Sequence, residues 1–133
     1  MIFVVDAAAV LNDDNFSFQA GNSYLITNKV LSELKDMRSR SLADGAIKTG
    51  FLSVRDPKGE FIEKASGSAR RSGTRLSEAD LSVVALSLEL RAAKKIFVVL
   101  TDDYSVQNAL MHERIRFEGT AHPGISGKRV FGR

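Results

Sequence analysis

Three aspartates follow short apolar runs in the sequence, where a buried strand would end. Asp6 comes directly after the apolar residues 2–5, and Asp102 and Asp103 follow the apolar residues 97–100 with one threonine between. Short runs of this kind are typical of strands that are buried on both faces of a parallel sheet. Because ligand sites in open α/β sheets lie just past the carboxyl ends of the strands, these carboxylates indicate a site there.

Two further acids, Glu33 and Asp80, lie in or at the start of predicted helices that can face the same sheet edge. Each also has a structural explanation. Asp80 stands three residues after Ser77, where its carboxylate can reach back to the backbone N–H of the helix cap. Glu33 lies beside Leu34 in an apolar stripe, and its side chain can extend to solvent from the edge of that face.

Acids that converge on one edge must become protonated, spread apart or bind cations, and we expect that they bind cations. Two carboxylates about 5 Å apart repel by about 3 kcal/mol at an effective dielectric constant near 20. The chain has no cysteine and no histidine at a metal-ligand spacing, so its oxygen donors suit Mg²⁺ or Mn²⁺ far better than Zn²⁺. The chemistry of such sites is phosphoryl transfer or phosphodiester hydrolysis.

A predicted alternation of strands and helices positions these acids. It predicts an α/β fold of three layers, α/β/α, with a central and mostly parallel sheet. We expect residues 66–75 to form a mobile basic loop, because Gly67 and Gly73 disfavour a helix there. The predicted strands are residues 2–5, 51–54 and 97–100, and the predicted helices are residues 27–43, 77–93 and a segment after Asp103.

Composition indicates one globular domain. The 133 residues are 44% hydrophobic and 26% charged, which is enough for one substantial core. We expect the domain to span residues 1–118 and a basic flexible tail to span residues 119–133. No apolar run approaches membrane-spanning length and the N-terminus does not resemble a signal peptide, so we expect a cytoplasmic protein with no membrane partner.

Charge is unevenly distributed along the chain. Residues 38–75 carry nine lysines and arginines against four acids, and residues 114–133 carry five against one. Residues 1–37 and 76–113 are each net negative by three. A polyanion bound along the basic blocks, with a metal held by the acidic ones, would use this pattern, although ordinary solvated faces would produce it too.

The acids and their neighbours resemble the acidic signature of the PIN-domain nucleases. The segments that carry the resemblance are residues 76–86 (LSEADLSVVAL) and 100–108 (LTDDYSVQN), together with Asp6 and Glu33. These segments are similar to those of the Nob-type branch, endoribonucleases that trim the 3′ end of small-subunit ribosomal RNA. The resemblance spans residues 1 to about 117. Members of this branch ordinarily carry a zinc ribbon after the PIN domain, and this chain has no cysteine.

The resemblance implies a metal-dependent endoribonuclease that cleaves single-stranded RNA, with small-subunit pre-rRNA and the pre-ribosomal particle as partners and a homodimer as a further expectation. It implies that Mg²⁺ or Mn²⁺ is bound by Asp6, Glu33, Asp80 and Asp103, with Asp102 as a close auxiliary. Thr101 would position water or phosphate. The residues expected to bind the RNA backbone, in a salt-sensitive way, are Arg55, Arg70, Arg71, Arg75, Lys128 and Arg129.

Three other functions fit parts of the sequence. A toxin-type PIN ribonuclease, held by an antitoxin, would use the same acids on transfer or messenger RNA. A non-catalytic PIN module would only bind RNA or an assembly factor, but it would be expected to lack some of these acids. A phosphotransfer domain would want a second aspartate close after the first, whereas Asp6 is followed by three alanines.

Overall fold

The computed structural model describes residues 1–120 and 129–131. Six strands form one sheet in the order β3-β2-β1-β4-β5-β6. The first five are parallel to one another, and β6 runs antiparallel to β5 at the edge. The strands are β1 (Ile2–Val5), β2 (Ser23–Ile26), β3 (Leu52–Val54), β4 (Phe97–Leu100), β5 (Phe117–Gly119) and β6 (Arg129–Phe131).

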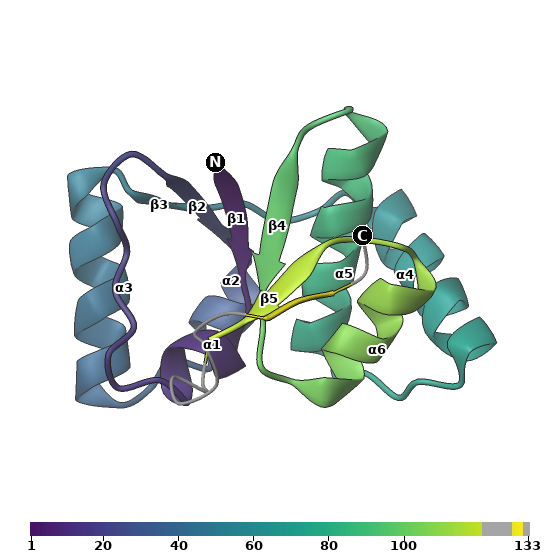
Figure 1. Ribbon diagram of the computed structural model, residues 1–133, viewed down its shortest axis with the longest axis horizontal. Helices are drawn as coiled ribbons and strands as arrows, with labels where there is room; N and C mark the ends of the chain where they lie inside the picture. The colour runs from purple at the N-terminus through teal and green to yellow at the C-terminus, as the bar shows by residue number, and fades with distance from the viewer. Residues whose placement is uncertain (121–128, 132–133) are drawn as a thin grey trace.

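Helices cover both faces of this sheet. In Figure 1, α3 lies on one side of the strands, and α4, α5 and α6 lie together on the other side. This arrangement confirms the predicted three-layer α/β/α fold with a mostly parallel sheet. The helices are α1 (Ala7–Leu11), α2 (Asn28–Leu31), α3 (Met37–Thr49), α4 (Gly59–Ser72), α5 (Glu78–Ala92) and α6 (Tyr104–His112).

Helix α5 is the central helix of its layer. Every residue from 82 to 90 is buried, including Leu86 and Leu90, which are almost completely inaccessible. A helix that is apolar on all sides must be covered on all sides, and α5 contacts α2, α4, α6 and β1. Its N-terminus is fixed by the predicted capping box of Ser77 and Asp80. The start of α5 is therefore a rigid position for the Asp80 carboxylate.

The register of the two central strands brings the predicted acids together. Strands β1 and β4 are adjacent, with Val5 opposite Leu100. The next residue on β1, Asp6, donates its backbone N–H to the carbonyl oxygen of Leu100 at 3.0 Å. Asp6 and Thr101 therefore leave the same edge of the sheet side by side, as the sequence predicted.

The predicted helix over residues 27–43 was wrong in its extent. Two helices stand there, because α2 ends at Leu31 and α3 begins at Met37. The predicted cap, Thr27, is correct: its side chain accepts from the backbone N–H of Val30. A second N-cap starts α3 as a separate helix, since the Asp36 carboxylate accepts the backbone N–H of Ser39 at 3.0 Å.

The predicted mobile loop over residues 66–75 was also wrong. Helix α4 continues through Gly67 to Ser72, and only Gly73, with φ +69°, ends it in the left-handed region. A helical glycine costs about 1 kcal/mol relative to alanine. Burial of Phe61, Ala65 and Ala69 on the same helix outweighs that cost.

Strand β2 and the expected tail over residues 119–133 are the remaining segments to compare with the sequence prediction. The sequence analysis did not identify β2, in which Tyr24 and Ile26 are buried. In the expected tail, β6 joins the sheet beside β5, and residues 121–128 and 132–133 lie outside the described residues. A domain boundary at residue 118 stays a prediction. Across residues 1–120 and 129–131, no helix is long and apolar enough to cross a membrane.

Candidate active site

Asp6 lies at the centre of the candidate site. Its side chain is only 2% exposed and caps α1, with Oδ1 accepting the backbone N–H of Ala7 at 2.8 Å. Oδ2 accepts the hydroxyl of Thr101 at 2.6 Å. The pKa of Asp6 is raised to about 7: burial is the main cause, the charges of Asp80 and Asp103 also raise the pKa, and the Thr101 hydrogen bond lowers it. The protein thus stabilises the negative charge of the ionised Asp6 carboxylate only poorly.

Thr101 connects the ends of three strands. Its backbone N–H donates to the carbonyl oxygen of Glu118 at 3.0 Å, which ties β4 to β5. Its buried hydroxyl donates to Asp6 and accepts the backbone N–H of Asp103 at 3.1 Å. Its carbonyl oxygen accepts the Gln107 side-chain amide at 3.0 Å. Thr101 therefore fixes Asp6 and Asp103 relative to each other.

Asp102 and Asp103 have different partners, which bears on their roles. Asp102 turns toward the end of β5, where its two oxygens accept the backbone N–H and the hydroxyl of Thr120, both at 2.6 Å. A Cβ on Gly119 would lie 2.9 Å from Asp102 Oδ1, so this close approach requires glycine. Asp102 thus ties the end of β4 to the end of β5, and its role as an auxiliary ligand stays a prediction; the sequence analysis did not single out Thr120.

Asp103 caps α6 with one oxygen only. Its Oδ1 accepts the backbone N–H groups of Ser105 and Val106 at 2.8 and 3.1 Å. Among residues 1–120, the hydrogen bonds that the Asp103 carboxylate accepts all go to Oδ1 and none to Oδ2. The geometry therefore favours Asp103 over Asp102 as the acid with a ligand position to spare.

Asp80 has the capping role that the sequence predicted, and its role as a metal ligand stays a prediction. Its Oδ2 accepts the backbone N–H of Ser77 at 3.3 Å, which completes the capping box. Burial raises the pKa of Asp80, and the charge of Asp103 raises it further. We call Asp6, Asp80 and Asp103 the acidic group, because their charges act on one another.

Glu33 is not part of the acidic group in the structure. It follows α2 in a turn and is exposed. The charges that raise the pKa of Asp6 come from Asp80 and Asp103. Helix α2 itself contacts α5 near its start, through Thr27 Oγ1 and Ser82 Oγ at 2.7 Å. The role of Glu33 as a ligand therefore stays a prediction.

The donor set of the acidic group fits a hard divalent cation. All its side-chain donors are carboxylate oxygens, and each carboxylate oxygen has lone pairs beyond those used in its hydrogen bonds. In the part of the chain that the structure describes, no three His, Asp or Glu residues are close enough to hold an ion entirely among themselves. Mg²⁺ is ordinarily held by one or two carboxylates, with water and substrate phosphate completing its shell.

Of the predicted RNA-binding arginines, two lie near a glutamate carboxylate and two are exposed to solvent. Arg55 donates to Glu89 at 2.8 Å, and Arg71 lies 3.9 Å from Glu113. Arg70 and Arg75 are exposed. Lys128 lies outside the described residues. The backbone of Arg129 belongs to β6, and its side chain lies outside the described part of the structure.

The loop that follows α4 lies next to the acidic group. Thr74 in this loop accepts the side-chain amide of Asn108 on α6 at 2.6 Å. Helix α6 begins directly after Asp103, and the loop leads into α5, where Asp80 stands. The basic end of α4 is therefore held close to the acids.

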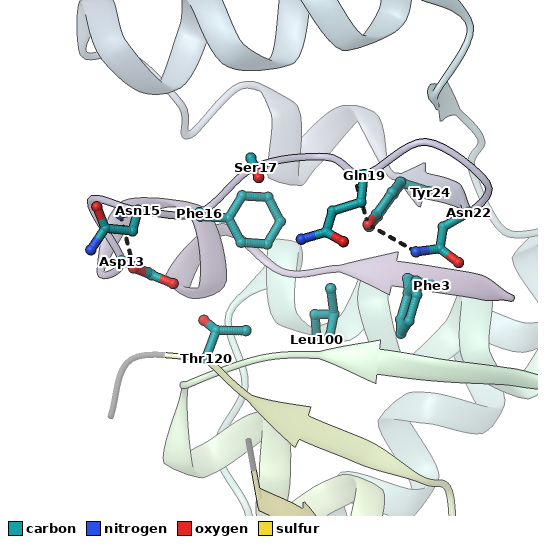
Figure 2. A pocket seen from close by; sticks show the side chains of 10 residues that line it. All are labelled: Phe3, Asp13, Asn15, Phe16, Ser17, Gln19, Asn22, Tyr24, Leu100 and Thr120. Carbon is teal, nitrogen blue, oxygen red and sulfur yellow. Dashed lines mark hydrogen bonds between the residues drawn. The ribbon is translucent and has the colours of Figure 1, made fainter. Parts of the chain in front are cut away.

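A separate hollow of about 220 Å³ lies under the loop between α1 and β2 (Figure 2). Three aromatic rings line it, those of Phe3, Phe16 and Tyr24. Phe18, which is not part of the lining, packs edge-on against Phe16 and Tyr24, with ring centroids 5.1 and 5.0 Å apart. The Tyr24 hydroxyl accepts the backbone N–H of Gln19 at 3.1 Å. These contacts anchor the loop on the sheet, so the aromatic wall has a structural explanation.

Comparison with known proteins agrees with this geometry. Residues 3–90 match the family described as "PIN domain of ribonuclease". Endoribonuclease Nob1 of Methanocaldococcus jannaschii is 31% identical over 118 residues, which cover 89% of this chain and 56% of that protein. Endoribonuclease Nob1 of Methanothermobacter thermautotrophicus is 31% identical over 124 residues, or 92% of this chain and 70% of that protein.

A relative with a different name is also similar. Ribonuclease VapC3 of Aeropyrum pernix is 41% identical over 98 residues, which cover 68% of this chain and 70% of that protein. The chain thus spans between about half and 70% of the length of these relatives. Taken with the acids at the carboxyl ends of β1 and β4, these matches show that the chain belongs to the PIN-domain endoribonuclease family and is of the Nob type.

Proposed function

We propose that this protein is a metal-dependent endoribonuclease that cleaves single-stranded RNA at the acidic group. The observation that carries the proposal is the buried Asp6 carboxylate, fixed by Thr101 and facing the charges of Asp80 and Asp103. Acids packed in this way destabilise the fold when ionised, unless a cation joins them. A site of this kind is built for a cation and for the phosphate that the cation attracts.

Asp6, Asp80 and Asp103 would hold Mg²⁺ or Mn²⁺. The bound cation would neutralise the phosphate charge and lower the pKa of a water molecule that attacks phosphorus. Thr101 orients the Asp6 carboxylate through its hydroxyl, and it orients Asp103 by accepting its backbone N–H. Asp102 keeps the segment in place through Thr120.

Arg70, Arg71 and Arg75 would bind the RNA backbone beside this site. Arg70 and Arg75 are exposed, and the loop after α4 is tied to α6 through Thr74 and Asn108. Backbone contacts of this kind depend on salt, because binding releases counterions from the RNA. We expect RNA affinity to fall steeply as the salt concentration rises.

The substrate that we propose is the 3′ end of small-subunit pre-rRNA, in a pre-ribosomal particle in the cytoplasm. The similarity to two proteins named Endoribonuclease Nob1 supports it. The 41% identity to Ribonuclease VapC3 supports a second candidate, a toxin-type ribonuclease with a different RNA target. Homodimer formation stays a prediction.

A short RNA that spans the mature 3′ end of small-subunit rRNA separates these candidates. The protein is incubated with this RNA and with an unrelated single strand, in Mn²⁺, in Mg²⁺ and in EDTA. Metal-dependent cleavage at the mature end supports the rRNA function. Cleavage of both RNAs at scattered sites supports a ribonuclease with another target, and absence of cleavage in either metal contradicts the proposed activity.

A further inference from the structure

Tyr104 is a large aromatic side chain that the fold does not use. It is the first residue of α6, directly after Asp103, and it is 84% exposed. A single exposed ring is common on protein surfaces, but this ring lines a hollow directly beside the candidate active site. Its neighbour in sequence, Asp103, belongs to the acidic group.

A hollow of about 180 Å³ lies beside this ring. Tyr104, Gln107, Asn108, Met111 and Phe117 line it. Pockets for drug-sized ligands occupy about 300–1,000 Å³, so this one suits a single planar fragment. Three of the lining residues, at positions 104, 108 and 111, recur at helical spacing on one exposed face of α6.

The polar side chains in the hollow are held in place. Gln107 donates its amide to the carbonyl oxygen of Thr101, and Asn108 donates its amide to Thr74. In each case the nitrogen is engaged in the recorded bond, which leaves the amide oxygen as an acceptor. The hollow therefore combines an aromatic wall, fixed amide groups and a connection to both the acidic group and the basic end of α4.

We propose that Tyr104 is a stacking platform for one nucleobase of the single-stranded RNA, next to the phosphate held at the acidic group. This inference rests on the proposed function for the identity of the ligand. Proteins bind single strands by combining basic side chains along the backbone with aromatic side chains under the bases. A base stacked on Tyr104 would fix the strand in register with Asp103, and Gln107 and Asn108 would contact its edge.

The test compares RNA binding by Tyr104→Ala and Tyr104→Phe, measured by fluorescence anisotropy in EDTA so that no RNA is cleaved. Met37→Ala is the matched control, because Met37 is 85% exposed and begins α3, outside the hollow. Alanine at position 104 is expected to weaken binding about 5- to 150-fold, which corresponds to about 1–3 kcal/mol per stacked base. Tyr104→Phe, which keeps the ring, and Met37→Ala should bind like the wild type.

A second measurement identifies the stacked base. Abasic sites are placed one at a time along the RNA, and the position that weakens wild-type binding should have no further effect on Tyr104→Ala. Unchanged binding by Tyr104→Ala would overturn the platform, even if the wild type cleaves RNA. Weakened binding without any cleavage by the wild type would support the platform and contradict the proposed catalysis. Absence of RNA binding by the wild type would overturn both.

Discussion

Two groups of carboxylates in this protein have opposite electrostatic environments. Burial raises the pKa of Asp6 and of Asp80, and the neighbouring acids raise both further. Burial also acts to raise the pKa of Glu89 and of Glu113, yet the pKa of both is lowered. Burial raises the pKa in both groups, so the neighbouring acidic or basic residues decide whether the net pKa shift is upward or downward.

The partners of the second group are provided by the fold. Glu89 accepts the backbone N–H of Lys58 at 2.8 Å and pairs with Arg55. Glu113 pairs with Arg91 at 2.8 Å. Within residues 1–120 the acidic group has no such basic partner, since its donors there are hydroxyl and backbone groups. The fold therefore stabilises the charges of Glu89 and Glu113 itself, and we propose that a cation from solution stabilises those of the acidic group.

The largest expected effect is that of Asp6→Asn on cleavage. We expect a loss of at least about 10²–10³-fold in the rate at saturating RNA, because the variant removes a charge at the point where the cation is held. The rate of RNA cleavage in Mn²⁺ measures it. A circular dichroism spectrum like that of the wild type would show that the fold is kept. A cleavage rate within tenfold of the wild-type rate would contradict the proposed difference between the two groups of carboxylates.

Metal-free stability should depend on pH through Asp6. Its pKa rises from 3.8 to about 7 on folding, so between these values the folded chain holds a proton that the unfolded chain has lost. Stability from this group should therefore fall as the pH rises from about 4 to 7, by at most about 4 kcal/mol. Urea unfolding in EDTA at pH 5 and pH 8 measures it. The fall should be smaller in Asp6→Asn, and equal falls in the two proteins would refute this assignment.

Asp102 and Asp103 should respond differently to replacement by asparagine. We expect Asp103→Asn to lower the cleavage rate about 10²-fold or more, with little loss of stability. Asp102→Asn should cost about 1–2 kcal/mol of stability, because Thr120 loses a carboxylate acceptor, and should lower cleavage less than tenfold. Single-turnover rates and urea unfolding of both variants test the contrast. The reverse order of rates would make Asp102 the ligand.

The smallest effect on catalysis is expected from Glu89→Gln, in the second group. The variant loses the ion pair with Arg55, and it keeps an oxygen that can accept the backbone N–H of Lys58. We expect a stability loss of about 1 kcal/mol and an unchanged cleavage rate at saturating RNA. If cleavage fell as far as it does in Asp6→Asn, the two groups would not be functionally distinct.

The elements that the sequence predicted correctly have local signals. Strands β1 and β4 are continuous apolar runs, and α5 begins at a capping box that two residues three positions apart, Ser77 and Asp80, define. The elements that were missed depend on tertiary packing. Strand β2 begins on the exposed Ser23, so it is not a continuous apolar run like β1 and β4, and α4 keeps Gly67 because its apolar face is buried.

The candidate site shows the same difference between features with a local sequence signal and features that depend on tertiary packing. Asp6, Thr101 and Asp103 could be placed together because adjacent parallel strands end at one edge of a sheet. The resemblance favoured Asp103 over Asp102, but the physical reason for the difference could not be predicted, because it depends on Thr120, eighteen residues further along the chain. For Glu33 the sequence left both a solvent-exposed and a ligand position open, and the structure shows the side chain exposed.

The most direct test of the account is calorimetric titration of Mn²⁺ into the wild type, Asp6→Asn and Glu89→Gln at pH 8. The account predicts that the wild type and Glu89→Gln bind the ion with similar affinity, and that Asp6→Asn binds it at least tenfold more weakly. Equal affinity in the wild type and Asp6→Asn would show that the acidic group is not the metal site, and would contradict the central claim.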